Sequence, residues 1–475
     1  MLAFFKINDP YRVLVVFSIL LLIRLPVLLA PGVLSVPELK WMVLGEKIAQ
    51  GAHLYLEVWD NTAPFSAWTY ALLHLLFGRS QTAYLVVALF IVTYQCLLFN
   101  NFLISKKAFN ENTYIPAVLL GLLSCVHFQL VTLSPQLMSI TFVILAVRNI
   151  FHRVDSQPKD ERILFTGLFL GIAVLFYLPA IIFLVSTLLV YLFFVGLKPR
   201  RYLLLLYGFS IPILLVMLYF FWIDALPELL SQYVVASLFN LGALSAGFTG
   251  LLAVLGMAAL LLIAAFFKLS RYHRYTNFQA RYQQIVLFTL IAAAGSLAIS
   301  FEYMPAVAWL FIPWAAFFGS HFLLLISRAL FAELWFGFIV VFTLLSGLGS
   351  TYGWLRFDDL YRNERLLIQS TPFDQVVSNQ RVTILGESFS AYQHAQIATP
   401  YLNWDITFRR LKEPAAYNRV AETFRHFRQD PPEIIVDEQE IMPGLMDHIP
   451  FLRESYQRQG RYLYRLKNPS VSVNR

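Results

Sequence analysis

The stretch SVPELKWMVLGEKIAQGAHLYLEVWDNTAPFSAWTYALLHLLFGRS, residues 35–80, decides how this chain must fold. It separates two strongly apolar segments, yet it mixes carboxylates and lysines with glycines and prolines. Polar backbone beside a membrane persists only where protein or water satisfies its hydrogen-bonding groups. The role of the stretch therefore depends on the class of protein and on the side of the membrane that it faces.

The composition predicts the class. Of the 475 residues, 58% are hydrophobic and 13% are charged, whereas an average globular domain has about 25% charged residues. No soluble fold of this length could bury so much apolar surface, so we expect a polytopic membrane protein. Residues 11–31 should remain as a first helix, because the segment is long, contains Arg24 and lacks a small-x-small cleavage site.

Eleven apolar segments approach the roughly 20 residues that a helix needs to cross a bilayer. They cover residues 11–31, 82–104, 113–131, 134–151, 163–178, 180–197, 203–222, 248–267, 285–300, 305–326 and 331–349. Lys and Arg gather in the loops on one side, which holds 16 of the 20 basic residues before position 351. Cytoplasmic loops carry this excess, so the N-terminus should be cytoplasmic and residues 35–80 and the tail extracytoplasmic.

The tail, residues 351–475, has ordinary globular polarity, with 16 basic and 15 acidic residues. RVTILGE (381–387), EIIVDE (433–438) and RYLYRLKN (461–468) predict strands, and PAAYNRVAETFRHFRQ (414–429) predicts a helix. We therefore expect a transmembrane domain at 1–350, with a first outer loop at 32–81, and a small extracytoplasmic α/β domain at 351–475. That domain could pack or dock a partner, or it could recognise an acceptor.

The first outer loop itself predicts two helices that lie on the outer surface of the membrane. PELKWMVLGEKIAQG (37–51) has apolar residues on one side and a glycine at its end, and APFSAWTYALLHLLFG (63–78) begins near a proline and ends at a glycine. We expect HLYLEVWDN (53–61) to be extended between them, and Trp68 and Tyr70 to lie at headgroup level.

This layout resembles the GT-C superfamily of membrane glycosyltransferases, in particular the protein mannosyltransferase and aminoarabinose transferase-like group. The first outer loop carries the most specific part of the resemblance: Glu38, Gly51, Tyr55, TAPF (62–65) and LLFGRS (75–80). Two weaker blocks are GLFLGIAVLFYLPAIIF (167–183), with Tyr177 where the family usually has lysine, and FEYMPAVAWLFIP (301–313). The resemblance implies an α-helical GT-C fold and transfer of a sugar from a polyprenyl-phosphate carrier to a lipid, glycan or protein.

Two departures from the family pattern bear on activity. The family loop often has paired acidic residues where this chain has PELK (37–40), with one, and Thr62-Ala63 stand where the family turn has lysine. They leave open a second hypothesis, a catalytically inactive scaffold that binds a lipid-linked intermediate or an export partner. A transporter is disfavoured, because the spans carry few charges and show no repeated halves with matching broken helices.

The reaction that the resemblance implies requires a carboxylate base. Glu38 is the first candidate, and the alternative is a surface carboxylate favoured by the helix dipole at its N-terminus. Asp60 is the second catalytic candidate, and the alternative is an Asx-turn that caps its own backbone.

Binding of the substrate requires cationic and polar groups for the phosphate. Arg24, inside a span, could contact a lipid phosphate, pair with Glu38 or extend outward to water. Lys40 could meet phosphate or be a solvated interfacial lysine. The remaining substrate-binding candidates are Tyr55, Tyr177, Glu302 and Tyr303.

No His, Cys or acidic spacing predicts a metal site, although the family sometimes uses a divalent cation. Cys96 and Cys125 lie inside apolar spans and are expected to be packing residues. The expected partners are a polyprenyl-phosphate-linked sugar and membrane lipid, with no nucleic acid, and the expected location is a bacterial inner membrane.

Overall fold

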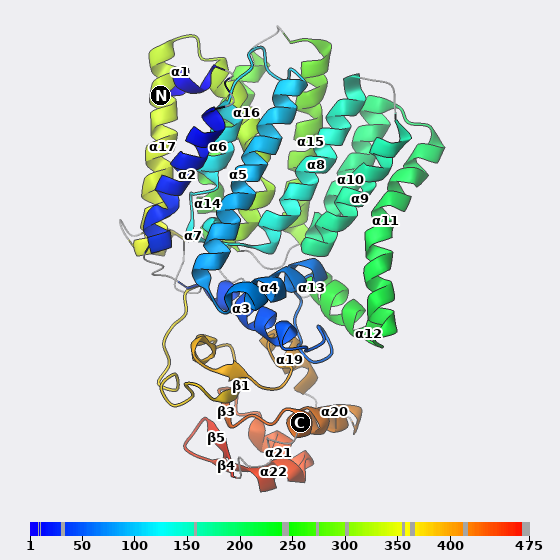
Figure 1. Ribbon diagram of the computed structural model, residues 1–475, viewed down its shortest axis with the longest axis vertical. Helices are drawn as coiled ribbons and strands as arrows, with labels where there is room; N and C mark the ends of the chain where they lie inside the picture. Colours follow the sequence, from blue (N-terminus) through cyan, green and yellow to red (C-terminus); the bar gives the residue numbers. More distant parts are fainter. Residues whose placement is uncertain are drawn as a thin grey trace. The chain divides into compact units, whose positions relative to one another are not determined.

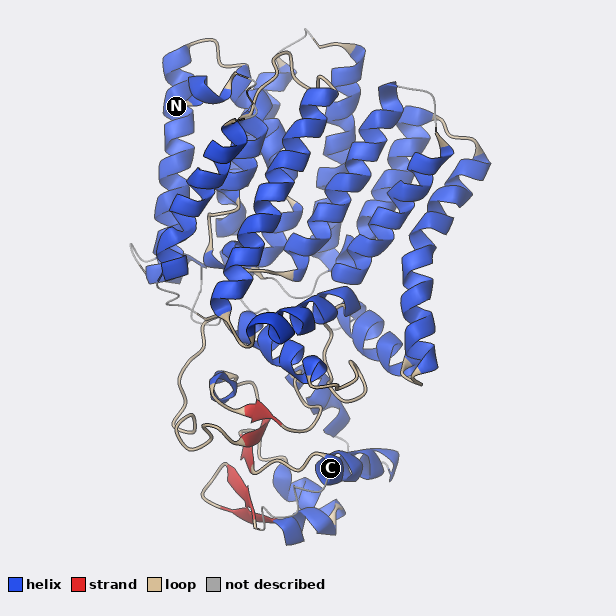
Figure 2. Ribbon diagram, viewed as in Figure 1, coloured by secondary structure: helices blue, strands red, loops and turns tan. Residues whose placement is uncertain are grey.

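A computed structural model of the chain describes residues 1–7, 9, 11–29, 34–155, 159–239, 247–271, 275–299, 304–353, 357–361, 366–411 and 417–467. Helices dominate it, and strands occur only in the tail of the described chain (Figures 1 and 2). The chain divides into two compact units. The first comprises Met1–Val33, Gln81–Tyr219 and Ala243–Arg365, and the second comprises Leu34–Ser80, Phe220–Gly242 and Leu366–Arg475.

The first unit is built from helices. Its helices are α1 (Leu2–Phe5), α2 (Arg12–Leu29), α5 (Gln81–Ser105), α6 (Ile115–Leu123), α7 (Phe128–Val131), α8 (Pro135–Asp155), α9 (Asp160–Phe176), η1 (Leu178–Ile181), α10 (Ile182–Val190), η2 (Tyr191–Val195), α11 (Pro199–Trp222), α14 (Gly247–Ser270), α15 (Asn277–Ile299), η4 (Pro305–Leu310), α16 (Ile312–Leu324), α17 (Ala329–Tyr352) and α18 (Phe357–Tyr361). The end of α11 continues into the second unit.

Seven helical segments of the described chain are long and apolar enough to cross a membrane, which agrees with a multi-pass protein. They are Arg12–Leu29, Gln81–Ser105, Leu178–Val195, Pro199–Trp222, Thr249–Ser270, Asn277–Ile299 and Ala329–Tyr352.

The other four of the eleven predicted spans do not form single apolar helices long enough to cross a membrane. The segment 113–131 is divided between α6 and α7, and 305–326 between η4 and the 13-residue α16. The segment 134–151 falls on a shorter apolar helix, Pro135–Phe151, and 163–178 falls on the 17-residue α9. Apolar composition located these helices, but composition does not show where hydrogen bonding interrupts them.

The GLFLG part of the second family-like block brings two helices together. A Cβ on Gly167 would collide with the carbonyl of Leu205, and a Cβ on Gly171 would collide with that of Phe209, both on α11. Glycines at this spacing let two membrane helices approach backbone to backbone. The block therefore has a packing role in the crossing of α9 and α11.

The first outer loop folds into the two predicted helices, α3 (Val36–Ala49) and α4 (Pro64–Phe77). Ser35 caps α3, since its Oγ accepts a hydrogen bond from the Glu38 amide at 3.3 Å. At Gly78 the backbone φ is 65°, a left-handed value that glycine adopts without strain, and α4 ends there. The two helices cross closely at Gly45, where a Cβ would lie 2.6 Å from the carbonyl oxygen of Tyr70.

Two expectations for this loop are wrong. Residues 53–61 are not simply extended, because a bridge between Leu54 and Val58 closes a turn in which Tyr55 has a φ of 69°. The aromatic ring of Tyr70 does not face outward, since it is fully buried and stacks on Trp41 at 5.6 Å between ring centroids. The exposed face of α4 is apolar instead and consists of Leu72, Leu75, Leu76 and Phe77.

The tail of the second unit contains a five-stranded mixed sheet with the strand order β2-β1-β3-β5-β4. The strands are β1 (Arg381–Leu385), β2 (Gln396–Ile397), β3 (Ile434–Asp437), β4 (Tyr456–Arg458) and β5 (Leu463–Leu466). Strand β1 is parallel to β2 and β3, and β5 is antiparallel to β3 and β4. The three predicted strands and the small α/β domain are confirmed.

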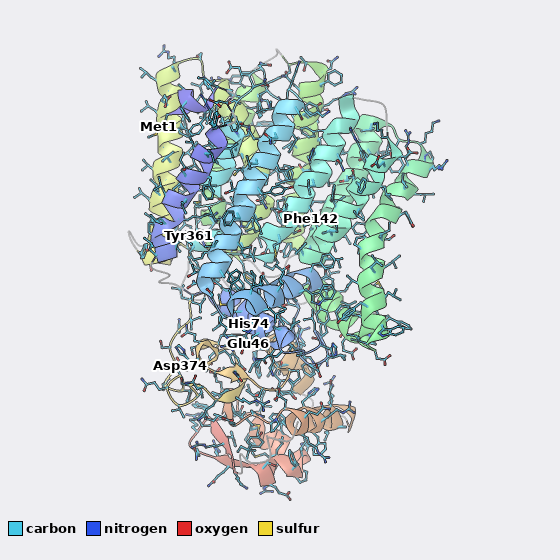
Figure 3. All side chains as sticks on the ribbon, viewed as in Figure 1. Met1, Glu46, His74, Phe142, Tyr361 and Asp374 are labelled. Atoms are coloured by element: carbon cyan, nitrogen blue, oxygen red, sulfur yellow. The ribbon has the colours of Figure 1, made fainter. Side chains whose placement is uncertain are left out.

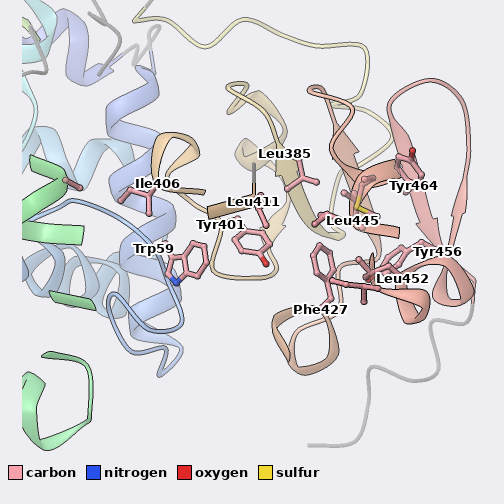
Figure 4. Close-up of a cluster of buried hydrophobic side chains, with 14 residues drawn as sticks. Trp59, Leu385, Tyr401, Ile406, Leu411, Phe427, Leu445, Leu452, Tyr456 and Tyr464 are labelled. Atoms are coloured by element: carbon pink, nitrogen blue, oxygen red, sulfur yellow. The ribbon is translucent and has the colours of Figure 1, made fainter. Parts of the chain in front are cut away.

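Helices complete the second unit. They are α12 (Leu226–Glu228), η3 (Leu229–Val235), α13 (Ala236–Phe239), η7 (Ser390–Gln393), α19 (Trp404–Leu411), α20 (Tyr417–Gln429), α21 (Met442–His448) and α22 (Pro450–Ser455). The predicted helix at 414–429 corresponds to α20. One apolar cluster joins tail residues such as Tyr401, Phe427 and Leu445 to Trp59 of the first outer loop (Figure 4). The loop and the tail therefore share a core.

Candidate active site in the first outer loop

The polar centre of the loop is Asp60, whose side chain is fully buried. The ammonium of Lys40 lies 2.7 Å from its Oδ1, and the hydroxyl of Thr62 donates to its Oδ2 at 2.7 Å. The backbone amide of Asn61 also donates to Oδ1, at 2.8 Å. A buried carboxylate is tolerated only with partners of this kind. Lys40 keeps 16% of its side chain exposed, so it is the more exposed member of the pair.

The turn before Asp60 is fixed by Tyr55. Its phenol donates to the carbonyl of Thr62 at 2.7 Å, and its own carbonyl accepts a hydrogen bond from Gln232 Nε2 at 2.7 Å. Burial, with Tyr233 and Asp60 nearby, raises the pKa of the Tyr55 phenol well above its usual value. Tyr55 therefore stays a neutral donor that holds the turn closed.

Asn403 is a member of this site that the sequence reasoning missed. Its Nδ2 donates to Asp60 Oδ1 and to Asn61 Oδ1, each at 3.2 Å, across more than 340 positions of chain. The available signal was local: Asn403 directly precedes α19, in the position where asparagine caps helices. The pattern of a helix cap in the tail does not indicate which distant side chain the Nδ2 group of that asparagine will contact.

Glu38, the first candidate base, lies in the first turn of α3 with 3% of its surface exposed. The alternative of an exposed surface carboxylate is thus excluded, although Glu38 does occupy the position that the helix dipole favours. Side chains two positions apart leave a helix on opposite sides. Glu38 and Lys40 therefore flank α3 and do not share one face.

Two further candidates belong to the first unit. Arg24 has 1% of its surface exposed, so its side chain does not extend outward to water. Its guanidinium donates to Ser124 Oγ at 3.1 Å and to the carbonyls of Val131 and Ser124 at 3.3 and 3.4 Å. Tyr177 is partly exposed and lies where α9 ends and η1 begins, in extended backbone.

Glu302 and Tyr303 lie outside the described residues, so their predicted roles stay predictions.

Two ion-paired groups fasten the loop helices to the tail within the second unit. Arg79 pairs with Glu46 and donates to the carbonyls of Tyr392 and Ala395 (Figure 3 labels Glu46). Lys47 pairs with Asp430 at 2.9 Å. These contacts hold α3 in place against the tail.

Within the described ranges, no three His, Cys, Asp or Glu side chains gather closely enough to hold a metal ion. Cys96 and Cys125 are buried and free, as expected of packing residues. The possible divalent cation of the family therefore receives no support from the part of the chain that is described.

No protein-family model matches the chain, and no curated protein is significantly similar to it in sequence. Among solved structures, the chain is similar to ArnT from Cupriavidus metallidurans bound to undecaprenyl phosphate, with a TM-score of 0.57 and 12% identity over 98% of this chain and 100% of that one. The same protein in its apo state gives a TM-score of 0.55 at 12% identity, over 92% and 94%.

The oligosaccharyltransferase AglB from Archaeoglobus fulgidus, in complex with an inhibitory peptide and a dolichol-phosphate, gives a TM-score of 0.48 at 12% identity, over 98% of this chain and 75% of that one. Similarity at such low identity concerns the fold and does not extend to activity. The chain therefore has the fold of ArnT, a GT-C membrane glycosyltransferase, as the resemblance in its first outer loop predicted.

Proposed function

We propose that the protein is a membrane glycosyltransferase that moves a sugar from a polyprenyl-phosphate carrier to a lipid, glycan or protein at the outer face of a bacterial inner membrane. The observation that carries the proposal is the full-length similarity in fold to ArnT, a protein solved with undecaprenyl phosphate bound. The partly exposed Lys40 side chain and the buried Glu38 side chain in the first outer loop support it. The orientation with a cytoplasmic N-terminus rests on the distribution of Lys and Arg.

The reaction is a single displacement. Glu38 takes the proton of the acceptor hydroxyl while that oxygen bonds to the anomeric carbon. The bond from this carbon to the phosphate oxygen breaks, the electron pair leaves with the polyprenyl phosphate, and the anomeric centre inverts. Lys40 stabilises the departing phosphate.

Asp60 then has a different role from the one first considered for it. Its carboxylate already accepts hydrogen bonds from Lys40, Asn61, Thr62 and Asn403. These donors occupy both carboxylate oxygens of Asp60 and fix their position. We assign Asp60 to positioning Lys40, and we leave the base to Glu38.

The test is Glu38→Gln, with Glu57→Gln as the matched control. Glu57 is an exposed carboxylate of the same loop that accepts a hydrogen bond from the His53 amide at 2.7 Å, which a glutamine oxygen preserves. With undecaprenyl-phosphate-linked, radiolabelled pentoses and hexoses as donors and membrane extract as acceptor, Glu38→Gln should lower transfer on the order of 10²–10⁴-fold. Glu57→Gln should leave it unchanged. Equal transfer by Glu38→Gln and wild type would remove Glu38 as the base.

One observation favours the alternative, a non-catalytic scaffold that binds a lipid-linked intermediate or an export partner. The turn at Thr62-Ala63 contains no lysine, and the neighbouring Asp60 is ion-paired with Lys40. Tight retention of undecaprenyl phosphate by purified wild type, with no label transferred from any donor, would select the scaffold.

A further inference from the structure

Two backbone hydrogen bonds place the tail against the polar turn of the first outer loop. The amide of Trp59 donates to the carbonyl of Pro400 at 2.7 Å, and the amide of Asn403 donates to the carbonyl of Trp59 at 3.0 Å. Both main-chain groups of Trp59 are thereby bound to the tail. Asp60 follows directly in sequence, so its backbone position depends on this pairing.

The side chain of Asn403 is oriented by its own helix. Its Oδ1 accepts a hydrogen bond from the Ile406 amide at 3.4 Å, which is the cap geometry for the start of α19. Because the oxygen faces the helix, the amide nitrogen must face away from it. Nδ2 consequently donates to Asp60 and Asn61.

We propose that Asn403 is a positioning residue for phosphate recognition by Lys40, acting through the chain Asn403–Asp60–Lys40. Asp60 Oδ1 receives donors from Lys40, Asn61 and Asn403 at once. Loss of one donor to a buried carboxylate weakens its localisation, and Lys40 loses the fixed counter-ion that aims its ammonium. The phosphate part of this inference rests on the proposed function.

The decisive variant is Asn403→Ser, because serine also caps helices but lacks the amide donor. Asn403→Thr, another capping residue, serves if the serine variant does not fold. The matched control is Thr407→Val. It removes a hydrogen bond of 2.8 Å from the Thr407 hydroxyl to the Asn403 carbonyl in the same first turn of α19, without touching Asp60.

Reductive methylation of the full-length protein, quantified by mass spectrometry at single lysines, tests the Asn403–Asp60–Lys40 contacts directly. We expect Asn403→Ser to raise the rate at Lys40 roughly fivefold, since a weakened ion pair shields the amine less from the reagent. Lys47 is the internal control, because it joins the same helix to the tail through Asp430. Its rate should not change, and Thr407→Val should change neither.

Binding of undecaprenyl phosphate by the purified protein in detergent is the second readout. Its dissociation constant should rise roughly tenfold in Asn403→Ser and stay unchanged in Thr407→Val. Equal rises at Lys40 and Lys47 would reveal general loosening of the tail and overturn the inference, as would no rise at Lys40. Absence of binding by wild type would count against the proposed function, whereas the lysine readout would still decide the role of Asn403.

Discussion

Arg24 and Lys40 are both cations that the sequence offered for a phosphate, and the structure surrounds them differently. Arg24 is 1% exposed and meets only neutral acceptors among the described residues, at 3.1–3.4 Å. Lys40 keeps 16% exposure of its side chain and meets the Asp60 carboxylate at 2.7 Å. The first is enclosed within the helical unit, and the second is ion-paired but partly exposed.

The difference shows two ways of keeping a charge in an apolar protein. At Arg24, the ends of α6 and α7 leave the carbonyls of Ser124 and Val131 without helical partners, and the guanidinium donates to them. At Lys40, a carboxylate neutralises the charge and leaves the ammonium partly accessible. The first arrangement is suited to fastening helices, and the second to meeting an anionic ligand. Contact between Arg24 and a lipid phosphate stays a prediction.

The largest expected effect is at Asp60. Asp60→Asn removes the counter-ion of Lys40 and should destabilise the protein by about 3 kcal/mol, the lower end of the range for breaking a buried pair, because Lys40 can turn partly to water. Lys40→Gln combined with Asp60→Asn should cost less than the sum of the single variants. Thermal unfolding of the purified protein in detergent measures this cycle. Additive losses would show that the two side chains are not coupled.

Arg24 should give the next largest effect, and it should appear in stability. Arg24→Leu leaves the carbonyls of Ser124 and Val131 without their donor, which should cost about 1–2 kcal/mol. The control is Arg201→Gln in the same unit, which breaks an exposed pair with Asp160 and should cost well under 1 kcal/mol. Unchanged stability with weakened binding of undecaprenyl phosphate would instead support the lipid-phosphate role of Arg24.

The smallest expected effect is a dependence on pH in the core shared by loop and tail. Burial, with Arg410 and Arg425 nearby, lowers the pKa of His426 to about 4, against about 6.5 in an unfolded chain. The unfolded chain therefore binds the proton first, and stability falls as the pH drops from about 6.5 to 4. The ring of His426 lies 5.2 Å from that of Trp59, so the loss should reach the first outer loop.

Hydrogen exchange of peptides that contain Trp59, followed between pH 7 and 5, measures this loss after correction for the intrinsic exchange rate. His426→Gln should weaken the pH dependence of exchange in the Trp59 peptides. Peptides around Arg24 should show the same pH dependence in the variant and in the wild type. If the pH dependence of exchange persists in His426→Gln, groups other than His426 cause it. The second unit would then differ less from the first in its response to pH than we expect.

Much of the fold was predictable because it depends on local patterns. Long apolar segments predicted the helices, Ser35 and Gly78 mark ends of the loop helices, and short β-branched runs predicted β1 and β3. The interruption at 124–127 was not predicted as a break in a span, whereas the one near Tyr177 lies where the predicted spans 163–178 and 180–197 meet. Apolar composition continues through them, whereas the hydrogen bonds do not.

The site was predictable only in part. Glu38, Lys40, Tyr55 and Asp60 stood out as charged or family-like residues in an apolar context, but their partners did not. Nothing in the spacing linked Lys40 to Asp60, and nothing linked either residue to Asn403. Such pairings depend on which segments, hundreds of residues apart, fold next to each other. The local patterns of a single sequence do not specify this.

The sequence by itself determined that the chain is a helical membrane protein with a polar loop at 35–80 and a small α/β tail, because hydrophobicity and periodicity act within a few turns of the chain. Only the tertiary structure decided that this loop and the tail share one core, and that Asp60 is saturated by donors while Lys40 stays accessible. The reason is physical: burial and hydrogen bonding of a side chain are set by its neighbours in space, and those neighbours come from the whole chain.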